Sequence, residues 1–202
     1  MDDAAEISAV TDYANKGRFG GSWWEDLRFP AQGINPPGAV SDPAVESTTG
    51  LLLFSASATN LIGGVAQLPH GWVEESVIEP HIHWQKTTSA AGNVLWRFEY
   101  EVVDNGAVAA MTYANVVDSL TSLAPDTNTA NLVLVNSFGN VVMTGKHISC
   151  MMLWKLSRIG GDGTDTYGAN ARLLELDIHY QLNQAGSDQL YRKYLDARQQ
   201  GV

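Results

Sequence analysis

The sequence is poor in the residues that usually point to a function. It contains one cysteine, Cys150, so no disulfide can form within the chain, and we expect this residue to be a small buried hydrophobe. Lys and Arg number 12 against 22 Asp and Glu, which gives a formal net charge of −10. Such an acidic chain repels phosphate backbones. The composition therefore argues against direct binding to nucleic acid.

Long hydrophobic runs are also absent. The longest apolar stretches fall far short of the roughly 20 residues that a membrane helix needs. The chain begins Met1-Asp2-Asp3, which is not a secretory signal. We therefore expect a protein made in a cytoplasm, without a membrane partner. Charged residues make up only 17% of the chain. A surface this poor in charge is often covered by another chain, so we expect a homo-oligomer or an assembly component.

The common catalytic signatures are missing as well. The chain has no phosphate-binding glycine loop, zinc-finger spacing, nucleophile elbow or paired CxxC. The run Gly160–Asp165 resembles half of a calcium loop but lacks the later glutamate ligand, and we interpret it as a turn. No cofactor is implied by these motifs, and we expect that the protein is not an enzyme.

What the sequence does contain is regular alternation of apolar and polar residues, which is typical of half-buried β-strands. In 93–103 one face is apolar and the other carries Arg97, Glu99 and Glu101. In 171–182 we expect Leu174, Leu176, Ile178, Tyr180 and Leu182 to point to the core, and Glu175, Asp177, His179 and Gln181 to point away from it.

These patterns predict an all-β fold, a jelly-roll-like β-sandwich of about eight antiparallel strands in one domain. A short turn at Ser89–Gly92 predicts that strands 77–86 and 93–103 form a hairpin, and residues 104–130 look like an excursion with a weak strand at 111–117. We divide the chain into an N-terminal arm and Pro/Gly-rich docking segment (1–50), the sandwich (51–185), and a tail (186–202) with a short helix over 188–199. The remaining strands are expected at 51–57, 62–68, 131–136, 140–144, 147–157 and 172–182.

The run Pro80-His81-Ile82-His83-Trp84 places two imidazoles on one face of a strand. Histidines at this spacing can bind one transition metal, and the candidates for further ligands are Glu175, Asp177, His147 and His179. In a trimer, the histidine pairs of three chains could instead surround one ion on the axis. The two histidines also resemble the start of the cupin metal motif, but the glutamate expected after the pair is replaced by Lys86 and Thr87. The leading interpretation is that the histidines pair with acidic neighbours. The candidates for that pairing are Glu99, Glu101 and Asp177.

The charged ladders could in principle perform acid–base chemistry, but alternate charges on a strand usually form a solvated or interfacial face. We interpret Arg97, Glu99, Glu101 and Asp177 as interface residues that set the register between subunits. Trp23, Trp24 and Phe29, in the run Trp23–Pro30, are predicted to contact a neighbouring subunit, because aromatic side chains favour interfaces.

Several runs together resemble a group of small proteins from tailed bacteriophages and prophages. The similarity spans about residues 20–185 and rests on Trp23–Pro30, Gly33–Gly38, Leu68–His70, Pro80–Trp84, Trp96–Tyr100, Ser157-Arg158 and Leu173–Tyr180. The resemblance implies a virion structural component with a β-rich fold, made in the cytoplasm of a host bacterium. It transfers no catalytic residue.

Three functions follow as hypotheses. The first is an exterior capsid decoration, collar or fibre-type component, trimeric in that role, that adheres to other capsid, portal, neck or fibre proteins. The second is a carbohydrate- or receptor-binding module of the virion. The third is a cupin-like metalloenzyme that uses His81, His83, Glu175 and His179.

Overall fold

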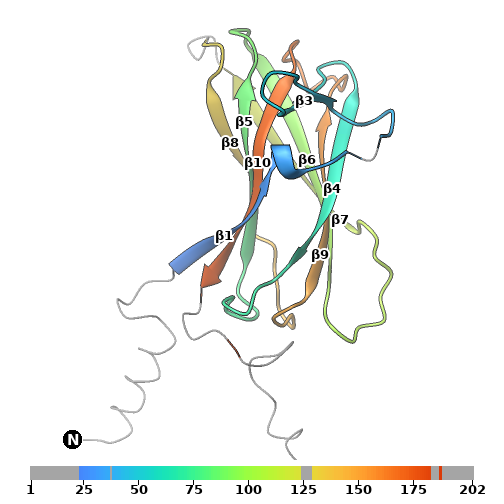
Figure 1. Cartoon of the computed structure of the whole chain (residues 1–202), viewed down its shortest axis with the longest axis vertical. Helices are drawn as coiled ribbons and strands as arrows, with labels where there is room; N and C mark the ends of the chain where they lie inside the picture. The colour runs from blue at the N-terminus through green and yellow to red at the C-terminus, as the bar shows by residue number, and fades with distance from the viewer. Residues whose placement is uncertain (1–22, 37, 124–128, 183–186, 188–202) are drawn as a thin grey trace, which may run out of the picture.

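The computed structural model describes residues 23–36, 38–123, 129–182 and 187. They form two antiparallel sheets packed face to face (Figure 1). In the part of the chain so described, the only helical element is one 3-10 turn, Ala31–Gly33. The all-β prediction is therefore confirmed. The arm over residues 1–19 and the helix over 188–199 lie outside the described residues. The described chain contains no helix with the length and hydropathy needed to cross a bilayer.

The six-stranded sheet has the order β2-β3-β10-β5-β8, with β1 pairing β10 beside β3. The four-stranded sheet has the order β4-β9-β6-β7. The eight strands β3 to β10 thus form two quartets, 3-10-5-8 and 4-9-6-7, which is the strand order of a jelly roll. The strands are β1 (Trp23–Pro30), β2 (Ala44–Val45), β3 (Leu52–Phe54), β4 (Thr59–Gln67), β5 (Ile78–Lys86), β6 (Gly92–Val103), β7 (Asn115–Leu123), β8 (Val133–Ser137), β9 (Met151–Ile159) and β10 (Ala171–Leu182).

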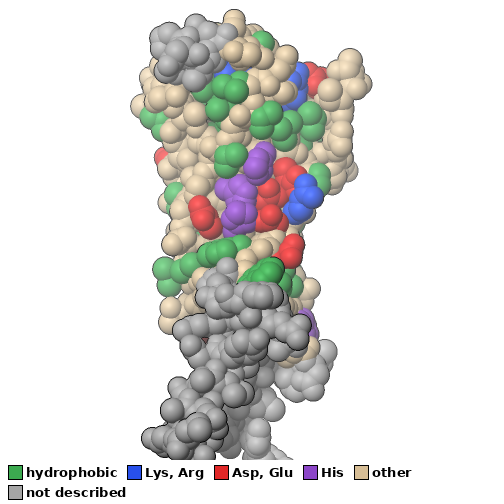
Figure 2. Space-filling view, turned by 90° about the vertical axis from the view of Figure 1, so that its left-hand side faces the viewer, with side chains coloured by type: hydrophobic (Ala, Val, Ile, Leu, Met, Phe, Trp, Pro, Cys, Tyr) green, Lys and Arg blue, Asp and Glu red, His purple; other side chains and the backbone are tan. Residues whose placement is uncertain are grey.

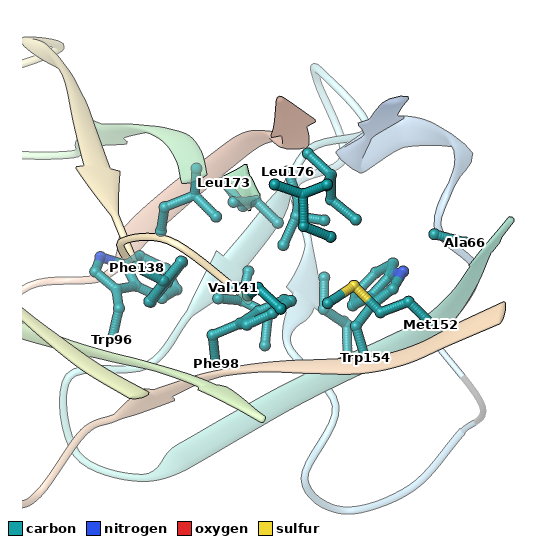
Figure 3. Close-up of a cluster of buried hydrophobic side chains, with 14 of the residues drawn as sticks. Ala66, Trp96, Phe98, Phe138, Val141, Met152, Trp154, Leu173 and Leu176 are labelled. Atoms are coloured by element: carbon teal, nitrogen blue, oxygen red, sulfur yellow. The ribbon is translucent and has the colours of Figure 1, made fainter. Parts of the chain in front are cut away.

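The core lies between the two sheets and is rich in aromatic side chains (Figure 3). The alternation in β6 holds, because Val94, Trp96 and Phe98 are fully buried. Phe98 stacks on Phe138 with ring centroids 5.3 Å apart, which joins the sheets at this level. Cys150 is also buried, as the sequence predicts.

The predicted hairpin between 77–86 and 93–103 is wrong. β5 pairs with β10 and β8 in one sheet, whereas β6 pairs with β9 and β7 in the other. The connection after Lys86 therefore crosses between sheets, as jelly-roll topology requires. A short turn fixes the length of a connection, but it does not select the strands with which its two ends pair.

Three further strand predictions need correction. Residues 140–144 form no strand, and only Val141 makes an isolated bridge, to Ile78. The weak strand expected at 111–117 is the longer β7, which is the edge of its sheet. β1, within the predicted docking segment, pairs with β10 along its whole length. This last pairing makes β1 part of the six-stranded sheet.

Candidate functional site

The outer face of the six-stranded sheet carries a cluster of histidine and acidic side chains. On β5, His81 and His83 point outward, because the residues between and beside them, Pro80, Ile82 and Trp84, are buried in the sandwich. β10 lies antiparallel to β5, so that Asp177 is opposite His81 and Glu175 is opposite His83. Figure 2 shows the histidines near the middle of this face with acidic side chains beside them.

A bulge in β10 produces this arrangement. The register with β5 shifts between Leu173 and Glu175, which leaves Leu174 as an extra residue. Leu173 is buried before the bulge and Leu176 after it, whereas Leu174 is only partly buried. The prediction that Leu174 points into the core is therefore wrong. Bulges re-aim side chains and are common beside functional sites; here the bulge directs Glu175 and Asp177 outward.

Asp177 lies between the two histidines of β5. Its Oδ2 is 3.5 Å from His81 Nε2 and 3.3 Å from His83 Nε2. Its other oxygen, Oδ1, is buried and has no hydrogen-bond partner among the described residues. Asp177 is therefore the acidic residue that lies beside both histidines. The other two predicted partners, Glu99 and Glu101, belong to the other sheet.

Burial dominates the electrostatics of this group. Loss of solvation is the largest cause that raises the pKa of Asp177 to about 7, and the nearby Glu175 and Asp26 carboxylates add to it. Burial also lowers the pKa of His81, as does the positive charge that the neighbouring His179 ring would carry. Both effects favour the uncharged form of the His81 ring, which is the form that binds metals.

Two ion pairs lie beside the cluster. Arg28 of β1 donates two hydrogen bonds to Glu175, of 2.5 and 2.6 Å, and these are the main cause that lowers the pKa of the Glu175 carboxyl. His179 Nε2 lies 2.7 Å from Asp26 Oδ1. The His179 ring still contacts His81, with centroids 4.3 Å apart. His179 is thus near the predicted metal pair but faces Asp26.

An open pocket of about 550 Å³ adjoins these groups. Its lining is mainly charged, so the arrangement suits a cation or a ligand rich in hydroxyl groups. The pocket is lined by Glu25, Asp26, Arg28, His83, Leu174, Glu175 and Asp177. Sequence reasoning missed the contribution of β1. The alternation of Trp24, Asp26 and Arg28 in a run that also contains Phe29 could have indicated a strand with a polar face.

The charged ladder of β6 lies on the other sheet, away from this cluster. Arg97 makes a two-pronged ion pair with Asp118 of β7, with distances of 2.7 and 2.8 Å. Glu99 pairs with Lys155 of β9 at 2.7 Å. Glu101 is partly buried. Arg97 and Glu99 therefore have partners within the chain, and their role at a subunit contact stays a prediction.

The predicted aromatic contacts divide into two kinds. Trp23 and Trp24 are 44% and 43% exposed, so both keep a large apolar surface outside the core. The Trp24 ring is tilted relative to the His179 ring, and the two ring centroids are 6.2 Å apart. Phe29 instead packs against the core, edge-to-face with Trp154 at 5.3 Å.

The remaining histidines are engaged elsewhere. His147 pairs with Asp104 at 2.6 Å. His70 hydrogen-bonds with Ser149 and with the backbone oxygen of Ser187. Neither belongs to the cluster of His81, His83 and Asp177, whose ligand atoms all lie within 4.8 Å of one another.

Comparison with known proteins adds little beyond the fold. No protein-family model matches the chain, and no curated protein matches its sequence. Among solved structures, the CBM36-1 domain of a multidomain xylanase from the hindgut metagenome of Trinervitermes trinervoides is 8% identical, with a TM-score of 0.40 over 76% of this chain and 96% of that chain. The CBM35 from Cellvibrio japonicus Abf62 is 8% identical, with a TM-score of 0.42 over 79% and 99% of the two chains.

A third similar structure is the insecticidal delta-endotoxin Cry8Ea1 from Bacillus thuringiensis. It is 10% identical, with a TM-score of 0.44 over 79% of this chain and 24% of that chain. Identities and TM-scores as low as these support no statement about ligands or partners.

Proposed function

We propose that this chain is a structural component of a tailed-bacteriophage particle that acts by adhesion between subunits. In this role it decorates the exterior of the capsid or forms part of a collar or fibre, and it assembles as a homotrimer. The proposal rests on the sequence resemblance described above and on one structural observation, the exposed tryptophan pair of β1. It assigns no catalytic role to the chain.

The tryptophan pair supports adhesion because both side chains lie outside the core on a strand that pairs with β10 along its whole length. Trp23 is opposite Leu182 and Trp24 is opposite Gln181 in the ladder between β1 and β10, which fixes their backbones. A large aromatic side chain on a rigid strand buries much area on binding and loses few rotamers. Contiguous apolar surface that is left exposed often marks a contact site.

The surrounding face has the composition of a contact surface. On β8, Val133 and Val135 lie opposite Gln85 and His83 and are 51% and 56% exposed. Apolar side chains thus occur on both sides of the polar cluster, and Figure 2 shows hydrophobic side chains on either side of the histidines. A polar group within an apolar surround gives orientation as well as affinity.

Particle incorporation tests this proposal directly. The double variant Trp23→Ser/Trp24→Ser should be folded but should be missing from purified virions when it replaces the natural chain, as measured by mass spectrometry of the particles. In solution it should also sediment as a smaller species than the trimeric parent chain. Val65→Ser is a matched control, because Val65 is 49% exposed on β4 of the other sheet. A parent chain that is monomeric and absent from virions would refute the proposal.

The open acidic pocket favours a second candidate, a carbohydrate- or receptor-binding module of the virion. Trp24 shares a face of β1 with Asp26 and Arg28, which line the pocket. Carboxylates accept hydrogen bonds from sugar hydroxyls, and an indole ring can stack on a sugar. A glycan array distinguishes the two candidates: glycan binding that is lost in Trp24→Ala supports the second, and an array without binding, together with particle incorporation, supports the first.

A further inference from the structure

We propose that His81, His83 and Asp177 bind one divalent transition-metal ion of the zinc class, with a coordination position left open toward the pocket. The proposal concerns the ligand chemistry of this cluster and does not depend on whether the chain is a virion component. It rests on the spacing of the ligand atoms, on the buried oxygen of Asp177, and on the type of ligand atoms present.

The spacing is that of ligands around one ion. Ligand atoms about 2.0–2.2 Å from a zinc ion at tetrahedral angles lie about 3.3–3.6 Å from one another. Asp177 Oδ2 is 3.5 Å from His81 Nε2 and 3.3 Å from His83 Nε2. All three ligand atoms lie within 4.8 Å of one another, so rotation of the side chains, without a large movement of the backbone, would bring each of them to an ion between them.

Other histidine–carboxylate pairs of the same chain show what a direct contact looks like. His147 Nδ1 and Asp104 Oδ2 share a hydrogen bond of 2.6 Å, whereas His179 Nε2 and Asp26 Oδ1 are 2.7 Å apart without the geometry of a hydrogen bond. Charged pairs that share a hydrogen bond have distances of about 2.7–2.9 Å. The two contacts of Asp177 are longer by more than half an ångström, so His81 and His83 surround this carboxylate without closing on it.

Asp177 is also incompletely satisfied. The residue is 5% exposed, and within the described part of the chain its buried Oδ1 has no hydrogen-bond partner. An unpaired carboxylate oxygen in a buried position costs free energy unless a cation or donor reaches it. A bound metal ion would supply that charge, because both oxygens of one carboxylate can serve the same ion.

The ligand atoms select the class of metal. Two imidazole nitrogens and one carboxylate suit zinc and its neighbours, whereas calcium and magnesium prefer sites made of oxygen atoms alone.

The pocket leaves room for a further ligand. His83 and Asp177 line it, and the His83 side chain is 38% exposed. Glu175 lines it as well, but Arg28 holds both of its oxygens. Three protein ligands with an open position are typical of zinc sites that accept an external ligand. The external ligand here would be water or a donor group from a bound molecule.

Titration of the metal-stripped full-length chain tests the proposal. Isothermal titration calorimetry with Zn²⁺ should give one tight site per chain, and Co²⁺ should produce visible absorption bands of a low-coordinate site with nitrogen and oxygen ligands. His83→Gln should weaken Zn²⁺ binding by about 100-fold or more, since even the loss of an outer contact costs about 10–100-fold. His147→Gln should bind as the parent chain does, because His147 pairs with Asp104 outside the cluster.

A control for folding is the melting temperature of each chain in the presence of a chelator. His83→Gln should melt at the same temperature as the parent chain, because His83 is partly exposed. Asp177→Asn provides a second variant that removes the shared ligand with almost no change in shape. It should likewise lose the tight site and the Co²⁺ bands. Absence of a one-to-one site in the parent chain, or equal affinity in the parent, His83→Gln and Asp177→Asn chains, would overturn the proposal.

Discussion

Arg158 and Asp165 form an ion pair in which neither side chain is exposed. The guanidinium donates two hydrogen bonds to the carboxylate, of 2.7 and 2.9 Å. It also donates to the backbone oxygens of Phe54, Tyr167 and Ala169, and Asp165 accepts a hydrogen bond from Leu95 N. Because Phe54 belongs to one sheet and Leu95 to the other, this pair ties the connection after β9 to both layers of the sandwich.

Breaking this pair should strongly destabilise the fold. Asp165→Asn keeps the shape of the side chain but leaves the Arg158 charge buried without its counter-ion, and losses of this kind are about 3–5 kcal/mol. Asp118→Asn is the matched control, since Asp118 pairs with Arg97 in the same two-pronged way but is 42% exposed. Exposed pairs contribute about 0.2–1 kcal/mol. Urea denaturation of both variants measures the difference, and similar losses would contradict the distinction.

Truncation of Phe29 and truncation of Trp24, two aromatic residues of β1 in different environments, should change the stability of the fold by different amounts. Phe29→Ala removes the edge-to-face contact with Trp154 and part of the core packing, so we expect a loss of about 2–4 kcal/mol, somewhat less than for a fully buried phenylalanine. Trp24→Ala removes a side chain that is 43% exposed and should cost less. Thermal melting gives the stabilities. If adhesion is the role of β1, Trp24→Ala should weaken assembly more than it lowers the melting temperature, and an equal loss in both would identify Trp24 as a core residue.

Cys150 should be unreactive in the folded protein. Burial is the main cause that raises the pKa of this thiol to about 12, so at pH 8 only about one molecule in ten thousand would carry the reactive thiolate. A thiol with an ordinary pKa near 8.5 is about a quarter ionised at this pH. Iodoacetamide should therefore label the chain only after urea unfolds it. Rapid labelling of the native chain at pH 8 would show that the thiol is accessible.

The β-sandwich was predictable because the alternation of apolar and polar residues that indicates it lies within each strand. Alternation along β6 alone identifies Trp96 and Phe98 as core residues, and His81 and His83 must share a face of any strand that contains both. Strand pairing is not local, which explains the error in the hairpin. The turn after Lys86 is compatible with either a hairpin or a crossing between sheets, and only the competition among distant strands decides between them.

The candidate site shows the same division. Its histidines could be named from the sequence, but their acidic partner could only be narrowed to Glu99, Glu101 or Asp177. The choice of Asp177 depends on the register between β5 and β10, and that register depends on the bulge at Leu174. Leu173 and Leu174 are adjacent and both apolar, so the alternating pattern does not show which of them the strand leaves unpaired. Asp26 and Arg28 were missed because a docking segment outside the sandwich was expected to contain them.

A close approach of two backbones at Gly160 gives a further test of the fold. A Cβ atom at this position would lie 2.3 Å from the Ser55 backbone oxygen and 2.7 Å from that of Ala58, in the connection between β3 and β4. Neither oxygen can move aside without moving the chain, so Gly160→Ala should destabilise the protein by about 1–3 kcal/mol or more. Gly163 belongs to the same turn, and a Cβ atom there would have no described atom within 4 Å, so Gly163→Ala should change stability little or raise it by up to about 1 kcal/mol. Urea denaturation distinguishes the two, and a Gly160→Ala chain as stable as Gly163→Ala would mean that the turn after β9 does not press against the connection between β3 and β4.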